Sequence, residues 1–238
     1  MRELLLSGGT EDLPEPTGDV LFLFDPGTAK DLISNQICIA LANNATIDTI
    51  NKIDDNPTIR FAQGTSQGLI TLPTPINFEA LTEWTVEWTS RPTSIGSSYF
   101  TELFLDIAVT QGYPIGCRWA DGGYGNRNQF NIGNWSNAVL GQPSLVKSQA
   151  VNKDNRWAMV YKGGQLRIFY NGVLQMLAFG TGGSYSQSYI DKTQAFGLIA
   201  KIYLGYYNGT NQAWLGNMGR VRISNFARYL GNYTPVPF

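Results

Sequence analysis

Carboxylates are the side chains of this chain that best suit acid–base chemistry, because its 238 residues include no histidine. Ser-His-Asp and Cys-His catalysis and histidine metal ligands are therefore excluded. Two carboxylate pairs share a predicted strand face: Glu102 with Asp106, and Glu83 with Glu87. Four strand steps separate each pair by roughly 13–14 Å, whereas glycosidases need carboxylates about 5–9.5 Å apart. We predict no catalytic residues and no enzymatic activity; a pair drawn from two different strands is the alternative.

Two segments carry the oxygen-rich residues that calcium prefers, Asp54–Asn56 and Asp121–Asn126. Neither has the twelve-residue pattern of an EF-hand loop. Asp-Asn-Pro and Asp-Gly-Gly are also turn sequences, since Asp, Asn and Gly tolerate the backbone angles of tight turns. We therefore expect no cofactor and assign no metal ligand, and calcium is the ion that these segments would suit.

Sugar binding is the other chemistry that the residue types allow, since it needs an exposed aromatic face beside amide, carboxylate or guanidinium groups. Two Gly- and Asn-rich segments combine these features, Trp119–Arg127 and Tyr206–Trp214. The alternative is that their aromatic rings fold back onto the edge of the domain, where they would add to burial. The candidate ligand-binding residues are Asp121, Tyr124, Asn126, Arg127, Tyr207, Asn208 and Trp214.

Composition excludes several classes of function. The net charge of −1 provides no field for nucleic acid or an anionic membrane, and the basic residues are scattered. The apolar run Leu4–Leu6 is too short for a signal peptide or a membrane span. We expect synthesis in a cytosol and exit by lysis or inside a particle. Cys38 and Cys117 form no CxxC motif; we expect buried thiols, and a disulfide between them is the alternative.

The spacing of apolar residues is that of β-strands, and no segment of helical length has a 3.6-residue period. In residues 155–172 two alternating segments are joined by Gly-Gly and followed by Asn-Gly, which is hairpin chemistry. Many short strands separated by Gly, Asn and Pro indicate a sandwich or barrel. Alternation places Trp84, Trp88 and Trp157 on buried faces. In the predicted strand around residues 99–109, Leu103 lies on the apolar face and Glu102 on the opposite one.

The order of these segments resembles one family. Val20–Asp25, Trp84–Trp88 and the closing Arg222–Tyr229 with Tyr233–Pro235 are similar to the concanavalin A-like, laminin-G-like jelly-roll domain of tailed-bacteriophage virion proteins. The resemblance covers about residues 19–235. One departure is Ala158-Met159, which follows Trp157 where the family often carries histidines.

The resemblance implies an all-β, antiparallel jelly-roll sandwich of the lectin and glucanase type, with its first and last strands paired. In the last strand, alternation places Val221 and Ile223 inward and Arg220, Arg222 and Ser224 outward. The resemblance also implies a virion structural protein, displayed as capsid decoration or as part of the tail or its fibres, made in the host cytoplasm and located in the virion. The competing function is a lectin-like module that binds host-surface glycans.

The expected domain organisation is an N-terminal arm or linker at residues 1–18 and one sandwich at residues 19–238. Gly8-Gly9 and two prolines separate Leu4, Leu5 and Leu6 from the first strand. We expect these leucines to make assembly contacts, with other virion proteins or with a second copy of the chain, because burying an apolar cluster is favourable. The alternative is that they cover an open edge of their own sandwich.

Overall fold

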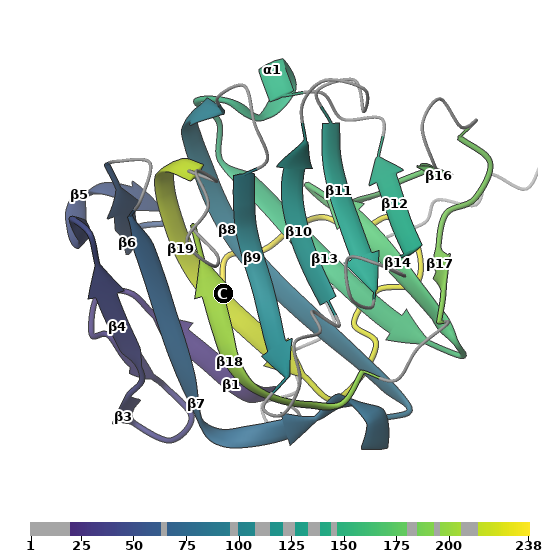
Figure 1. Ribbon diagram of the computed structural model, residues 1–238, viewed down its shortest axis with the longest axis horizontal. Helices are drawn as coiled ribbons and strands as arrows, with labels where there is room; N and C mark the ends of the chain where they lie inside the picture. Colours follow the sequence, from purple (N-terminus) through teal and green to yellow (C-terminus); the bar gives the residue numbers. More distant parts are fainter. Residues whose placement is uncertain are drawn as a thin grey trace, which may run out of the picture.

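The computed structural model of this protein describes residues 20–62, 66–95, 100–107, 115–120, 127–132, 139–143, 147–179, 185–192, 196–205 and 214–238. Within these ranges the chain is nearly all β (Figure 1), apart from the 3-10 turn η1 (Phe78–Ala80) and the short helix α1 (Lys147–Ala150). The predicted arm, with Leu4, Leu5 and Leu6, lies outside the described residues. No helix in the described ranges is long and apolar enough to cross a membrane.

Two antiparallel sheets pack face to face, which confirms the predicted β-sandwich (Figure 1). Sheet A has the order β15 (Val173–Leu174), β14 (Gln165–Tyr170), β13 (Asn155–Lys162), β8 (Glu83–Ile95), β19 (Trp214–Ser224), β1 (Val20–Asp25), β2 (Lys30–Asp31) and β3 (Gln36–Ile37). On this sheet β17 (Ile190–Asp191) pairs with β14, and β6 (Asn56–Phe61) joins β19 to β5 (Ala45–Ile53). Sheet B has the order β16 (Leu177–Phe179), β12 (Val139–Pro143), β11 (Arg127–Ile132), β10 (Ile115–Ala120), β9 (Phe100–Ile107), β18 (Leu198–Leu204), β7 (Gln67–Asn77) and β4 (Ile39–Ala42).

The first and last strands are neighbours, as predicted. In β1 and β19, Phe24 lies opposite Val221 and Val20 opposite Ser224. Val221 points into the core and is fully buried. Arg222 and Ser224 lie on the outward face, as predicted, but both are buried. The C-terminal segment (residues 225–238) covers that face of sheet A.

The C-terminal segment is held by a small apolar cluster on the outer face of sheet A. Tyr229 and Tyr233 pack against Phe169 of β14, with ring centroids 6.0 and 5.6 Å from it. The Tyr233 amide donates to the Gly172 carbonyl at 2.9 Å, on the predicted Asn171-Gly172 turn. Burial raises the pKa of both tyrosine hydroxyls. A tail with no regular secondary structure thus completes the fold.

The three tryptophans predicted to be buried are buried. Trp88 and Trp157 stack with ring centroids 6.0 Å apart, and Phe130 of sheet B lies 5.4 Å from Trp157. Trp84 forms a second aromatic group with Phe78, at 4.9 Å. Large rings from both sheets therefore fill the space between them.

Glu102 is not on the polar face predicted for it. Its side chain is fully buried, and Trp88 Nε1 donates to its Oε1 at 2.9 Å. The cause is an irregularity in the pairing of β9 with β10: Cys117 lies opposite Leu103, but Arg118 lies opposite Thr101. A bulge of this kind breaks the simple alternation of faces, so a carboxylate points into the sandwich.

Both cysteines are buried free thiols. Burial raises the pKa of Cys38 to about 12, with a further contribution from the nearby carboxylate of Asp31. A thiol with such a pKa is protonated and unreactive at neutral pH.

Candidate functional site

The residues predicted to bind sugar lie mostly outside the described part of the chain. Asp121, Tyr124 and Asn126 follow β10, and Tyr207 and Asn208 follow β18; none of the five is described. Arg127 begins β11 and Trp214 begins β19, and for these two the structure places the strand but not the side chain. The sugar-binding prediction for these loops therefore stays a prediction.

Both loops leave the sandwich at one end (Figure 1). β10 ends at Ala120, beside the start of β9, and β18 ends at Leu204, beside the same part of β9. Trp214 enters β19 opposite Ile95, the last residue of β8. A pocket lies at this end as well, formed on sheet A by β5, β6, β8 and β19.

The pocket encloses about 250 Å³. That is below the roughly 300–1,000 Å³ of sites for drug-sized ligands, and suits one small ring. Each of the four strands contributes a polar side chain to it. It is lined by Asn51, Arg60, Phe61, Ala62, Thr93, Leu215, Gly216 and Asn217.

Strand register sets the floor of the pocket. Asn217 lies opposite Arg60 of β6 on one side and Arg91 of β8 on the other, so the three side chains share the outer face. Gly216 adopts a φ of 147°, and a Cβ there would lie 2.2 Å from the carbonyl oxygen of Arg91. A glycine is therefore required at this position, and it lets β8 and β19 approach closely beneath the pocket.

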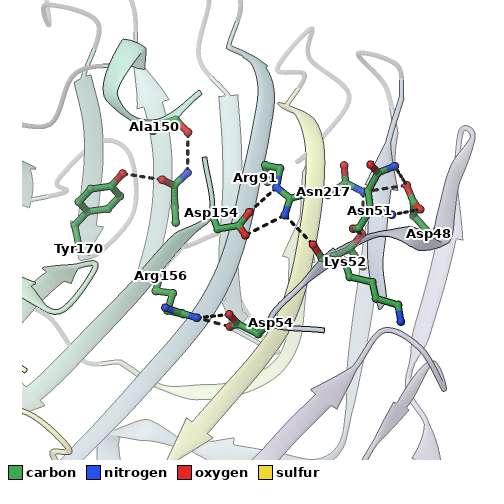
Figure 2. Close-up of polar contacts among 12 residues, drawn as sticks. Asp48, Asn51, Lys52, Asp54, Arg91, Ala150, Asp154, Arg156, Tyr170 and Asn217 are labelled. Atoms are coloured by element: carbon green, nitrogen blue, oxygen red, sulfur yellow. Dashed lines mark hydrogen bonds and ion pairs between the residues drawn. The ribbon is translucent and has the colours of Figure 1, made fainter. Parts of the chain in front are cut away.

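Asp48 organises the two amide side chains of the pocket (Figure 2). It accepts hydrogen bonds from the Asn51 amide N–H at 2.8 Å, from Asn51 Nδ2 at 2.8 Å and from Asn217 Nδ2 at 3.2 Å. The Ile50 amide donates to it at 2.9 Å, and Asn217 Nδ2 also donates to Thr58 Oγ1 at 2.8 Å. The amide nitrogens are thereby used inside the protein, and the amide orientation is fixed.

Burial alone would raise the pKa of the Asp48 carboxyl, but the hydrogen bonds from Asn51, Ile50 and Asn217 outweigh burial and lower its pKa to about 2. Asp48 is therefore ionised at all physiological pH values, and it serves as an acceptor that holds its neighbours in place. An ionised group of this kind is a poor general acid.

We expect Asp48 to titrate about two pH units below an ordinary aspartate. Its folded pKa of about 2 lies under the ordinary 3.8, so the stability that it contributes is complete above about pH 3.8 and is lost as the pH falls toward 2. A carbon-detected NMR titration of the Asp48 carboxyl measures this directly. A midpoint near pH 4 would show that the four hydrogen bonds do not act on the carboxylate. In the Asp48→Asn variant the corresponding part of the acid stability curve should disappear.

Two arginines brace the β5–β6 ribbon that forms one wall of the pocket (Figure 2). Arg91 of β8 binds the Asp154 carboxylate and donates to the Lys52 carbonyl at 2.7 Å. Arg156 of β13 pairs with Asp54 in the turn between β5 and β6. The wall is thus tied to neighbouring strands of sheet A at two points.

Several polar groups in the pocket have no partner within the described part of the protein. They are Asn51 Oδ1, Asn217 Oδ1, the Thr93 hydroxyl and the Arg60 guanidinium. Two amide acceptors, a hydroxyl and a guanidinium with five N–H donors thus face one small volume. This arrangement can bind a ligand that both donates and accepts hydrogen bonds.

In the described ranges no cluster of three or more Cys, Asp or Glu side chains could hold a metal ion. Asp54 of the segment considered for calcium pairs with Arg156 instead. Asp54 and Asp55 adopt φ of 53° and 61°, which is turn geometry. The other segment, Asp121–Asn126, lies outside the described residues.

Sequence reasoning missed the pocket. Asp48-Thr-Ile-Asn51 carried a usable signal, since an Asp that accepts from backbone amides two and three residues later is a common turn motif. Asn217 carries no such signal, because its burial depends on the strands that pair with β19. Nothing in the sequence shows that these two segments meet, because β5 and β19 are far apart in the chain.

No family model matches the chain, and no curated protein is similar to it in sequence. Solved structures do share its fold. Domain 4 of AbnA, a GH43 extracellular arabinanase from Geobacillus stearothermophilus solved with arabinotriose, matches 88% of this chain and 93% of that one, with a TM-score of 0.59 and 12% identity. The binding domain of botulinum neurotoxin DC, solved with rat synaptotagmin II, matches 89% of this chain with a TM-score of 0.65 and 11% identity. Trypanosoma rangeli sialidase, solved with 2,3-difluorosialic acid, matches 90% with a TM-score of 0.58 and 12% identity.

The chain spans 49% of the neurotoxin binding domain and 32% of the sialidase. At these identities the likeness shows the fold alone. None of these three neighbours is a phage protein. The protein is therefore a β-sandwich, and two of these three fold neighbours were solved with sugar ligands.

Proposed function

We propose that this protein is a carbohydrate-binding module and that the pocket between β5, β6, β8 and β19 holds one sugar ring. The observation that carries the proposal is the hydrogen bonding of the Asn217 side-chain amide. Its nitrogen is held by Asp48 and Thr58, while its oxygen accepts no hydrogen bond from the described residues. A fixed amide with an open acceptor suits a sugar hydroxyl, which can donate one hydrogen bond and accept others.

The side chains of the pocket are already held in place before a ligand binds, and this supports the proposal. Asn51 is held by Asp48, and the ribbon that carries it is tied down through Arg91 and Arg156. Preorganised side chains lose little conformational entropy when a ligand arrives, and this loss is one of the main costs of binding. The fold neighbour solved with arabinotriose gives independent support for the ligand class.

We propose binding without catalysis. Asp48, the carboxylate that holds the two pocket amides, already accepts four hydrogen bonds and stays ionised. Glu87 and Glu102, which the sequence singled out, are both buried, Glu87 beneath the C-terminal segment and Glu102 in the core. A bound glycan should therefore be recovered intact.

A virion location remains a proposal that rests on the sequence resemblance. In that setting the module would be displayed on a phage particle, in the capsid or the tail, and its targets would be glycans on the host surface. The predicted arm at residues 1–18 would attach it to other virion proteins or to a second copy.

A glycan array probed with the purified chain tests the proposed function, and Thr93→Val tests the pocket. Thr93 is exposed and its hydroxyl has no partner among the described residues, so the variant should fold normally. We expect it to weaken binding of the captured glycan about three- to tenfold, the value of one hydrogen bond. Asn217→Ala should weaken binding more.

The matched control is Thr71→Val, at an exposed position of β7 on sheet B that does not line the pocket. It should leave affinity unchanged. A chain that captures no glycan contradicts the proposed function. Capture that Thr93→Val and Asn217→Ala leave intact would place the binding site elsewhere, and release of shortened sugar would contradict a purely binding role.

A further inference from the structure

Arg60 is an unpaired cation in the wall of the pocket. Its side chain is exposed, and it makes no hydrogen bond or ion pair with the described residues. Other arginines on this face are engaged, since Arg91 pairs with Asp154 and Arg156 with Asp54. Arg60 is thus available to a ligand in a way that its neighbours are not.

Arg60 stays unpaired although Asp48 belongs to the same β5–β6 ribbon. The Asp48 carboxylate is already occupied by donors from Ile50, Asn51 and Asn217. The backbone of Arg60 is fixed between Thr46 of β5 and Asn217 of β19. The guanidinium is therefore anchored at its base, and no ion pair with a described carboxylate neutralises it.

The remaining groups that face the pocket are neutral: the oxygens of Asn51 and Asn217 and the hydroxyl of Thr93. Guanidinium binds carboxylate through two parallel hydrogen bonds, and such charge-assisted bonds are about twice as strong as neutral ones. Neutral amide and hydroxyl groups suit ring hydroxyls. One cation beside neutral polar groups matches a sugar that carries one carboxylate.

We infer that the pocket selects acidic sugars, with the carboxylate on Arg60 and the ring hydroxyls on Asn51, Asn217 and Thr93. The inference rests on the proposed function, because it names the class of sugar for the same site. The pocket volume of about 250 Å³ accommodates one ring rather than a longer chain.

D-glucuronate and D-glucose test the inference, since they share a ring and differ only in whether C6 is a carboxylate or a hydroxymethyl group. Each is titrated into ¹⁵N-labelled protein, and the side-chain resonances of Arg60, Asn51 and Asn217 are followed. We expect glucuronate to bind about tenfold more tightly than glucose, as one charge-assisted contact should provide. The Arg60 Nε–H resonance should shift with glucuronate and not with glucose.

Arg60→Gln should abolish the preference for glucuronate and keep the affinity for glucose, whereas Arg60→Lys should keep part of the preference. Lys52→Gln is the matched control, because Lys52 is an exposed cation of the same ribbon that does not line the pocket. It should change neither affinity by more than about twofold, the size of a screened long-range charge effect.

Equal affinities for the two sugars, or a preference that survives Arg60→Gln, would overturn the inference. Binding of glucose at this pocket without glucuronate would also overturn it, and would leave carbohydrate binding intact. Failure of both sugars to shift the three resonances overturns it as well; the glycan array then decides whether carbohydrate binding fails with it.

Discussion

Replacement of Trp88 by alanine is expected to lower the free energy of unfolding by about 3–5 kcal/mol, the usual cost of removing a large buried aromatic side chain. Trp88 is fully buried between the sheets and stacks on Trp157 at 6.0 Å. It also donates a hydrogen bond to Glu102 at 2.9 Å. Alanine would leave a cavity and deprive a buried carboxylate of one donor, and a urea or guanidinium titration monitored by circular dichroism measures the loss.

Trp88→Phe separates the two contributions, because phenylalanine fills much of the space but cannot donate to Glu102. We expect this variant to cost about 1–3 kcal/mol, the penalty for a buried acceptor that loses one hydrogen-bond donor. A loss under about 1 kcal/mol for the alanine variant would show that Trp88 does not pack between the sheets. A cost for phenylalanine equal to that for alanine would mean that the hydrogen bond, rather than the cavity, dominates.

Local patterns predicted the architecture well because strand faces alternate with a period of two residues. The burial of Trp84 and Trp157 and the inward face of Val221 follow from this rule alone. The Asn171-Gly172 turn follows from the positive φ angles that such turns need, and both residues have them. These features depend on neighbours in the sequence.

The features that the sequence did not predict depend on distant segments. Glu102 turns inward because of a bulge against β10. Alternation within one strand does not reveal how that strand pairs with its neighbour. Arg222 is buried because the C-terminal segment returns over the outer face of sheet A. The pocket needs Asp48 and Asn217 to meet across strands that are far apart in the chain.

The sugar-binding prediction for the two Gly- and Asn-rich segments stays a prediction, because most of their residues lie outside the described part of the chain. The two Gly- and Asn-rich loops flank β10 and β18, and the pocket of Asn51 and Asn217 lies at the same end of the sandwich. Sequence composition identified segments that could bind sugar, whereas the structure identified a pocket lined by fixed strand residues. Strand residues of a rigid scaffold hold the pocket groups in fixed positions.

The buried charge cluster of Glu87 beneath the C-terminal segment should be the other main determinant of stability. Arg222 Nε donates to Glu87 Oε2 at 2.7 Å, Arg228 Nε lies 3.3 Å from the same oxygen, and the Tyr229 hydroxyl donates to Oε1 at 2.8 Å. Glu87 and Arg222 are each only 3% exposed. The Glu87 carboxylate therefore contacts two guanidinium groups away from water and joins β8 and β19 to the C-terminal segment.

Glu87→Gln is expected to cost about 3–5 kcal/mol, because removing one partner of a buried ion pair leaves the other charge uncompensated. Glu83→Gln is the matched control on the same strand and the same face. Its partner Lys162 lies 2.8 Å away but is 48% exposed, so the loss should stay under about 1 kcal/mol. Denaturant titrations of the two variants, side by side, give the comparison.

Amide hydrogen exchange then shows which part of the protein loses stability in the Glu87→Gln variant. Since Glu87 contacts Arg228 and Tyr229, its replacement should release the C-terminal segment before the sheets open, with faster exchange at residues 225–238 and in the strand beneath them. Equal costs for the two glutamine variants would mean that the buried cluster contributes no more than a surface pair. A large cost for Glu87→Gln with unchanged exchange in the segment would show that the carboxylate stabilises sheet A itself and does not fasten the tail to it.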